Sequence, residues 1–209
     1  MLENIKWLEH DTFRIAGKKL IYLDPFKIKN PEAADIIFCS HSHHDHCSPE
    51  DIAKLIGKNT IIVAPEDCLK TLKINSLKTV KEIKTIKPGD TIEIDGIIVR
   101  AVPAYNTNKQ FHPKTNQWVG YIITIDDNTI YFAGDTDYIP EMKGFKGIDI
   151  AMLPVSGTYV MTAEEAANAA IDISPKIAIP MHYGSLVGTK ADAERFATLL
   201  KGKIPVKIL

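Results

Sequence analysis

One short segment of the chain concentrates side chains of the kinds that bind metal ions. It reads His41-Ser42-His43-His44-Asp45-His46 and follows directly on an apolar run at residues 35–39. Imidazole and carboxylate groups suit zinc, manganese or iron, whereas a thiolate-rich set would indicate structural zinc. The four candidate ligands are His41, His43, Asp45 and His46. Neighbouring side chains on such a loop point in different directions, so these four are poorly placed to surround one ion. We therefore predict two adjacent ions, held by His41 with His43 and by Asp45 with His46.

Four ligands cannot complete two metal sites, so we expect the others to come from different loops. Asp135 follows a predicted strand at residues 130–133, and His182 follows another predicted strand. His112 precedes a third, at residues 118–125. A loop at the end of a strand is held by a rigid scaffold, which is where binding residues tend to occur. These three side chains are therefore predicted to join the His-rich segment at one edge of a sheet.

The elements that must position these side chains alternate unevenly along the sequence. Short β-branched and apolar runs predict strands, and spaced apolar residues after Ser48, Thr162 and Thr189 predict capped helices. The predicted strands cover residues 5–8, 12–15, 20–23, 35–39, 60–64, 80–86, 91–94, 97–102, 118–125, 129–133, 148–153 and 176–181, and residues 206–209 close the chain. Strands buried on both faces need helices or a second sheet against them, so the pattern predicts a layered α/β protein with mixed sheets.

Two further details concern the predicted helices. After Thr162, a stripe that ends at Ile171 is expected to face the interior, and a further short helix is predicted at residues 65–72. No glycine-rich nucleotide-binding loop occurs in the sequence, which disfavours a kinase or a nicotinamide-dependent dehydrogenase.

Length and composition narrow the class of protein further. The 209 residues contain no linker-like stretch, so we expect a single domain spanning residues 1–209. A net charge of −1 disfavours a protein that coats nucleic acid or anionic lipid. Three cysteines in irregular positions do not indicate a disulfide framework. Because no signal peptide and no apolar run of about 20 residues is evident, we expect a cytoplasmic protein without a membrane span.

Several ordered motifs together resemble the metallo-β-lactamase superfamily. They are H-x-H-x-D-H at residues 41–46, Gly134-Asp135-Thr136 and Pro180-Met181-His182-Tyr183, accompanied by Leu8-Glu9-His10, Asp24-Pro25-Phe26 and Gly120-Tyr121. Within the superfamily, the chain resembles the small metal-dependent hydrolases near ascorbate-phosphate lactonase and N-acyl-phosphatidylethanolamine phospholipase D. The resemblance implies a four-layer αββα sandwich with the site at one edge of two facing sheets.

The resemblance also implies a complete ligand set for two divalent ions. The first metal would be held by His41, His43 and His112, the second by Asp45, His46 and His182, and Asp135 would bridge them. Close relatives carry the third-motif histidine directly after a strand, where this chain has Ala104-Tyr105-Asn106. Either His112 replaces that histidine from a longer loop, or Asn106 or water completes the first site. We favour His112, and we expect zinc, with manganese or iron as alternatives.

The chemistry expected of such a site is hydrolysis. Two ions about 3.5–4 Å apart lower the pKa of a bridging water and polarise a substrate oxygen. We therefore predict a hydrolase whose metal-activated hydroxide attacks an ester, lactone, amide or phosphodiester. Asp45 is expected to orient this nucleophile as well as bind metal, and Tyr183 to hydrogen-bond the developing negative charge or the leaving group.

The sequence predicts a small-molecule substrate. Lys109 and Lys114 flank His112, which indicates a phosphate-bearing substrate if their ammonium groups contact it. Two alternative functions remain on the same scaffold, an iron-dependent redox enzyme and a nuclease or nucleotide phosphodiesterase. The near-neutral charge disfavours the nuclease, so no nucleic acid partner is expected. A homo-oligomer is compatible with the sequence. His10, His44 and Cys47 lie outside the ligand positions and are interpreted as structural residues.

Overall fold

A computed structural model describes residues 2–72 and 80–209 of the chain. The chain forms two compact units, Met1–Lys87 and Pro88–Leu209, and each contains one six-stranded sheet. The predicted single domain stays a prediction, and the two units are described separately below.

The sheet of the first unit mixes antiparallel and parallel strands. In spatial order it contains β1 (Ile5–Glu9), β2 (Thr12–Ala16), β3 (Leu20–Leu23), β4 (Ile36–Phe38), β5 (Ile61–Ala64) and β6 (Glu82–Thr85). The pairs from β1 to β3 are antiparallel, and those from β3 to β6 are parallel. The carboxyl ends of β1, β3 and β4 therefore lie at the same edge of this sheet, so the loops that follow them begin near one another.

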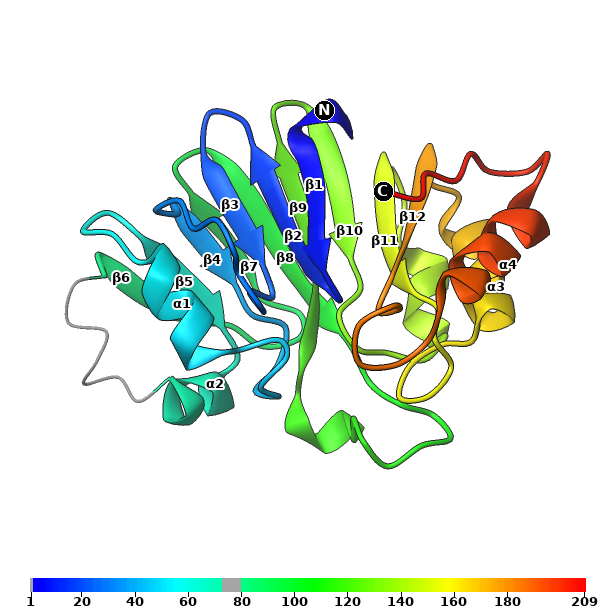
Figure 1. Cartoon of the computed structure of the whole chain (residues 1–209), viewed down its shortest axis with the longest axis horizontal. Helices are drawn as coiled ribbons and strands as arrows, with labels where there is room; N and C mark the ends of the chain where they lie inside the picture. Colours follow the sequence, from blue (N-terminus) through cyan, green and yellow to red (C-terminus); the bar gives the residue numbers. More distant parts are fainter. Residues whose placement is uncertain (1, 73–79) are drawn as a thin grey trace. The chain divides into compact units, whose positions relative to one another are not determined.

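Helices cover one face of the first sheet. A 3-10 turn, Leu2–Asn4, precedes β1, and α1 (Pro49–Leu55) and α2 (Glu66–Thr71) lie beside the parallel strands (Figure 1). The Ser48 hydroxyl accepts a hydrogen bond from the Asp51 main chain and Pro49 is the first helical residue, as the sequence predicts. Ile52 and Leu55 of α1 pack in one apolar cluster with strand residues such as Ile37.

The sheet of the second unit is also mixed. In spatial order it contains β12 (Ile177–Met181), β11 (Ile150–Pro154), β10 (Asn128–Phe132), β9 (Val119–Ile125), β8 (Ile97–Pro103) and β7 (Thr91–Ile94). Strands β10, β11 and β12 are parallel, whereas β7 to β10 pair antiparallel. The carboxyl ends of β8, β10, β11 and β12 therefore share one edge, together with the start of β9.

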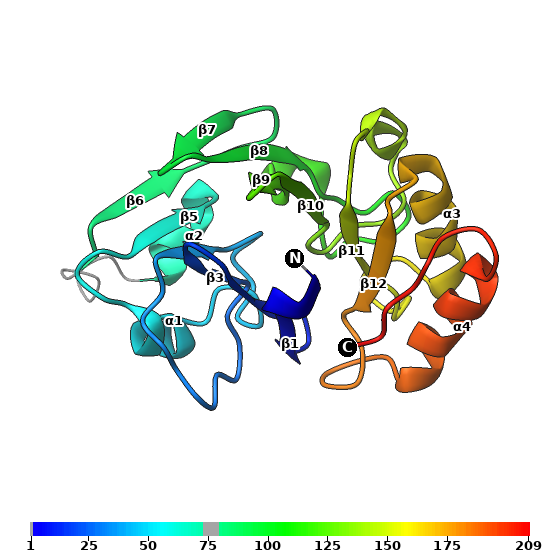
Figure 2. The ribbon, with the colours of Figure 1, turned by 90° about the horizontal axis from the view of Figure 1, so that it is seen from above.

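Two long helices flank β11 and β12 in the second unit. Figures 1 and 2 show α3 (Ala163–Ile173) and α4 (Lys190–Leu200) side by side. The reciprocal capping box of Thr162 and Glu165 begins α3 as predicted. Shorter 3-10 segments, Lys114–Asn116 and Pro140–Gly144, lie in the loops.

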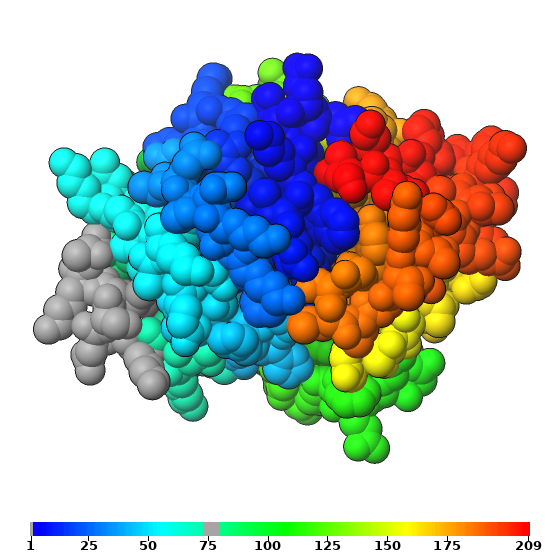
Figure 3. Space-filling view, in the orientation of Figure 1, coloured from blue at the N-terminus to red at the C-terminus, as the bar shows by residue number. Residues whose placement is uncertain are grey.

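One detail of the sequence prediction for the second unit is wrong, namely the burial of Ile171. Ile171 is 42% exposed, because it lies about 80° around α3 from Ala163, outside the buried arc, and Ile173 is buried instead. Residues 206–209 form no strand. Val206 makes only an isolated bridge to Ala178, beside Pro205, which has no main-chain N–H to donate. Figure 3 shows these last residues (red) at the surface next to α4.

Within residues 2–72 and 80–209, no helix combines the length and the apolar character that a membrane crossing requires.

Gly120 in β9 marks a close approach of two strands. A Cβ atom at this position would stand 2.7 Å from the carbonyl oxygen of Ala133 and 2.8 Å from that of Phe132. Both are main-chain atoms, which cannot turn aside as a flexible side chain can. Only glycine therefore fits at position 120, which lies beside the segment that leads from β10 to Asp135.

We expect Gly120→Ala to lower the free energy of unfolding by about 1–3 kcal/mol, as inserted methyl groups do in packed interiors. Urea denaturation followed by circular dichroism measures this change. Gly144→Ala is the matched control, because a Cβ at that position meets no atom within 4 Å. Equal stability of the two variants would show that β9 and β10 can separate to admit the methyl group.

Candidate metal centre

The loop after β4 brings two histidine nitrogens together in the first unit. Nε2 of His41 lies 3.0 Å from Nδ1 of His43, and Nδ1 of His41 lies 2.9 Å from the Ser40 hydroxyl. Ligands of a tetrahedral zinc at bond lengths of about 2.0–2.1 Å are separated by about 3.3 Å. His41 and His43 are thus spaced as neighbouring ligands of one ion would be.

Asp24, which directly follows β3, holds this loop in place through buried hydrogen bonds. Its fully buried carboxylate accepts hydrogen bonds from the main chain and the hydroxyl of Ser40, at 2.7 and 2.5 Å, and lies 2.7 Å from Nδ1 of His46. Burial raises the pKa of Asp24, and the hydrogen bond with His46 acts in the opposite direction. In the sequence, Asp24 stands out only as part of the motif Asp24-Pro25-Phe26. The structure shows it orienting His46 directly and His41 through Ser40.

His10 joins the same edge from the end of β1. It is 1% exposed, and its Nε2 lies 3.3 Å from Oδ2 of Asp45. Nε2 of His46 lies 3.7 Å from that same oxygen, so two imidazole rings approach one carboxylate. The interpretation of His10 as a merely structural residue missed this contact. Its place in the motif Leu8-Glu9-His10, after a strand that runs in the direction of β3, was the available signal.

In the second unit, a single carboxylate oxygen brings two predicted ligands together. Oδ2 of Asp135 lies 3.1 Å from Nε2 of His112 and 3.3 Å from Nε2 of His182. Asp135 is 3% exposed, and both histidines are 1% exposed. One carboxylate oxygen thus contacts two imidazole nitrogens, which groups three of the predicted ligands within the second unit.

Asn106 holds the ring of His112 through its side-chain oxygen. The side-chain oxygen of Asn106 accepts a hydrogen bond from the His112 main chain at 3.0 Å and lies 3.2 Å from its Nδ1. Its amide nitrogen donates to Asp137 at 3.0 Å and to the Tyr159 carbonyl at 2.8 Å. Both ends of the amide are thus engaged, and it is His112 whose ring nitrogen faces Asp135.

His182 is held in a corresponding way by the loop after β11. The Ser156 hydroxyl lies 2.9 Å from Nδ1 of His182. Gly188 packs behind this serine, since a Cβ at Gly188 would stand 2.6 Å from the Ser156 Cβ. The contacts of Asn106 and Ser156 at Nδ1 direct Nε2 of both histidines towards Asp135.

Several polar residues of these loops adopt left-handed backbone conformations. The φ angles are 47° for His10, 41° for Asp24 and 60° for His182. Such angles are uncommon for residues other than glycine and cost about 1–3 kcal/mol when the surroundings enforce them. The packing and hydrogen bonds around each residue must therefore hold it in place.

The two lysines beside His112 are paired with carboxylates. Lys109 Nζ lies 2.6 Å from Oδ1 of Asp137, which is 1% exposed, and Lys114 Nζ lies 3.0 Å from Oε1 of Glu141. Their charges are compensated within the unit, which weakens the argument for a phosphate-bearing substrate. Tyr183 is 4% exposed, and burial raises the pKa of its hydroxyl.

Comparisons with known proteins identify the family of this chain. A sequence family described as "Beta-lactamase superfamily domain" matches residues 4–182. The chain is 38% identical to the UPF0173 metal-dependent hydrolase Ta0764 of Thermoplasma acidophilum, over 95% of this chain and 92% of the relative. It is 36% identical to the protein of the same description from Pyrococcus horikoshii, over 98% of this chain and 95% of the relative. The chain belongs to the metallo-β-lactamase superfamily.

A solved structure places the chain in the same superfamily fold. It is that of a Parabacteroides distasonis protein assigned as a metal-dependent hydrolase, with a TM-score of 0.85 and 38% identity, covering 98% of this chain and 91% of that one. The predicted family and fold class are thereby confirmed. The mixed sheets and flanking helices seen in each unit are those of this superfamily fold.

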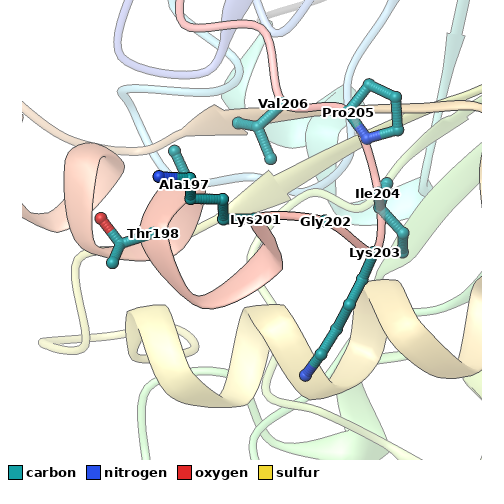
Figure 4. A pocket seen from close by; sticks show the side chains of 8 residues that line it. All are labelled: Ala197, Thr198, Lys201, Gly202, Lys203, Ile204, Pro205 and Val206. Carbon is teal, nitrogen blue, oxygen red and sulfur yellow. The ribbon is translucent and has the colours of Figure 1, made fainter.

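The residues present fit the divalent metal that membership of this superfamily implies. Imidazole and carboxylate groups are suitable donors. In His41, His46, His112 and His182, Nδ1 contacts a protein oxygen, which is how metal-binding histidines are commonly oriented. Apart from this centre, a groove of about 580 Å³ lies between the end of α4 and residues 201–206, and it contains none of the predicted site residues (Figure 4).

The buried Asn106 is expected to control metal affinity through His112. Removing its side chain in Asn106→Ala should weaken zinc binding about 10–100-fold, because the His112 ring loses the group that orients it. Chelator competition measures the affinity. Asn116→Ala, an exposed asparagine on the same loop, is the matched control. Unchanged affinity in Asn106→Ala would show that His112 is oriented without it.

His10 is expected to act on the site through Asp45. His10→Ala removes the ring that lies 3.3 Å from this carboxylate, so metal affinity should fall about tenfold. The exposed His44, in the variant His44→Ala, serves as the control, and the same chelator competition compares the two. If both variants bind metal as the wild type does, His10 is a packing residue only.

Proposed function

We propose that this protein is a dinuclear metal-dependent hydrolase, with the whole of residues 1–209 acting as one domain. The first ion is held by His41, His43 and His112, and the second by Asp45, His46 and His182, with Asp135 shared between them. Zinc is the proposed metal. The spacing of His41 and His43 within the first unit, and of both histidines around Asp135 within the second, supports this partition.

The observation that carries the proposal is the shared oxygen of Asp135. Oδ2 of Asp135 lies 3.1 Å from Nε2 of His112 and 3.3 Å from Nε2 of His182. A carboxylate that paired with one histidine only would need no second buried imidazole beside it. The loops that carry these histidines arise from before β9 and after β12, so the sheet brings together residues that are 70 positions apart in the sequence. Such convergence favours one centre with a common ligand.

When bound, the two ions would polarise a carbonyl or phosphoryl oxygen and lower the pKa of water. The protein's own groups then position the reactants. The Asp45 carboxylate, 24% exposed, can accept a hydrogen bond from the attacking water and orient it. The Tyr183 hydroxyl can donate a hydrogen bond to the negative charge that develops on the substrate or the leaving group. Substrates proposed for this chemistry are small esters, lactones or phosphodiesters.

Metal content and turnover test the proposal together. Protein purified without added metal should contain two equivalents of zinc, and His112→Ala and Asp135→Ala should each lose at least one. His44→Ala should keep both. Elemental analysis measures the metal, while p-nitrophenyl esters, lactones and bis-p-nitrophenyl phosphate report the reaction.

Two results would overturn this function. Two equivalents of metal in both variants would reject the proposed ligands, and absence of turnover on every substrate class with zinc bound would reject the hydrolase. Iron accompanied by an optical absorption band would instead support the redox alternative. Salt-sensitive binding of RNA or DNA would support a nuclease.

A further inference from the structure

Two exposed aromatic side chains contact one another on the loops of the second unit. Phe111 is 51% exposed and Tyr159 is 36% exposed. Their ring centroids lie 4.7 Å apart with an angle of 79° between the planes, an edge-to-face contact. Single exposed apolar residues are normal on a protein surface, but a preformed pair of rings presents a larger apolar surface, of the kind that marks binding sites.

This aromatic pair is connected directly to a proposed metal ligand. Phe111 immediately precedes His112 in the sequence. The main-chain carbonyl of Tyr159 accepts a hydrogen bond of 2.8 Å from Asn106, whose side-chain oxygen accepts one of 3.0 Å from the His112 main chain. The main chain at both aromatic residues is therefore tied to His112, and both side chains are exposed to solvent.

The charges around the aromatic pair do not suit an anionic group. Lys109 is paired with Asp137 at 2.6 Å, and Lys114 with Glu141 at 3.0 Å. Asp137 also accepts hydrogen bonds from the main chain and the side chain of Thr107. A phosphate or carboxylate on the substrate would have to displace these contacts, whereas an uncharged hydrocarbon group would leave them intact.

We propose that Phe111 and Tyr159 form the binding surface for an uncharged aliphatic or aromatic group of the substrate. This inference rests on the proposed hydrolase function and narrows it to neutral esters or lactones that carry a hydrocarbon group. The reaction is attack of water on the ester or lactone carbonyl. The C–O bond breaks, a carboxylic acid forms, and the alkoxide leaving group takes up a proton to become an alcohol.

Specificity for the acyl chain tests this surface. The zinc-loaded protein is assayed with p-nitrophenyl acetate and p-nitrophenyl octanoate, as wild type, Phe111→Ala and Tyr159→Ala. We expect both variants to lower kcat/KM for the octanoate about tenfold, through KM, and to change the acetate less than twofold, because only the longer chain reaches the rings. Ile171→Ala, an exposed apolar residue on α3, is the control and should behave as wild type.

The outcomes separate this inference from the function on which it rests. Metal content is measured for each variant and should equal that of wild type, since the main-chain bond of Tyr159 to Asn106 survives its substitution. Two results would overturn the aromatic surface but keep the hydrolase. In one, the substitutions lower kcat/KM equally for the acetate and the octanoate; in the other, neither substitution changes kcat/KM for either ester. Turnover of bis-p-nitrophenyl phosphate but of neither ester also overturns it. No turnover of any substrate by the zinc-loaded wild type overturns the hydrolase and this inference together.

Discussion

A carboxylate that is removed from water must be compensated by the protein around it, and Asp135 places this constraint on the second unit. Burying an isolated charge costs several kcal/mol, so a side chain that is 3% exposed requires partners in fixed positions. His112 and His182 supply nitrogens at 3.1 and 3.3 Å. Each of these rings needs a partner for its other nitrogen, which explains why Asn106 and Ser156 are also confined. One buried carboxylate thus determines the conformation of four loops.

Asp24 is a buried carboxylate of the first unit that likewise needs partners in fixed positions. This fully buried carboxylate receives hydrogen bonds from Ser40 and from His46, and through them it sets the His-rich loop after β4. In both units, the direction of the strands determines which loops can supply partners to the buried carboxylate. Loops that follow strands running in the same direction leave the sheet at one edge, so residues distant in sequence become neighbours without long connections.

Strand direction also explains how far the sequence could predict the structure. The His-rich segment, Asp135 and His182 each follow an apolar run, so their positions at strand ends were readable, and the family comparison confirms the fold. The helix caps at Ser48 and Thr162 were readable because capping depends on residues close in the sequence. The predicted burial of Ile171 is wrong because this residue lies about 80° around α3 from Ala163, outside the arc that packs inward.

Contacts between distant loops were not predictable in this way. The pairing of Lys109 with Asp137, and of Asn106 with Asp137, joins segments about 30 residues apart, and no local pattern encodes it. The sequence therefore left open whether Asn106 or His112 faces the other ligands. The contact of His10 with Asp45 was not predictable for the same reason, since it spans three strands and the loops between them.

The left-handed backbone at His10, Asp24 and His182 bears on how this protein could be altered. Glycine or asparagine would adopt these φ angles with less strain, yet polar side chains with particular hydrogen-bonding atoms occupy all three positions. Geometry at the metal-binding edge is thus maintained against local conformational preference. A selection for thermostability alone would favour relaxing these positions, and the more stable proteins it produced would be expected to have poorer catalytic centres.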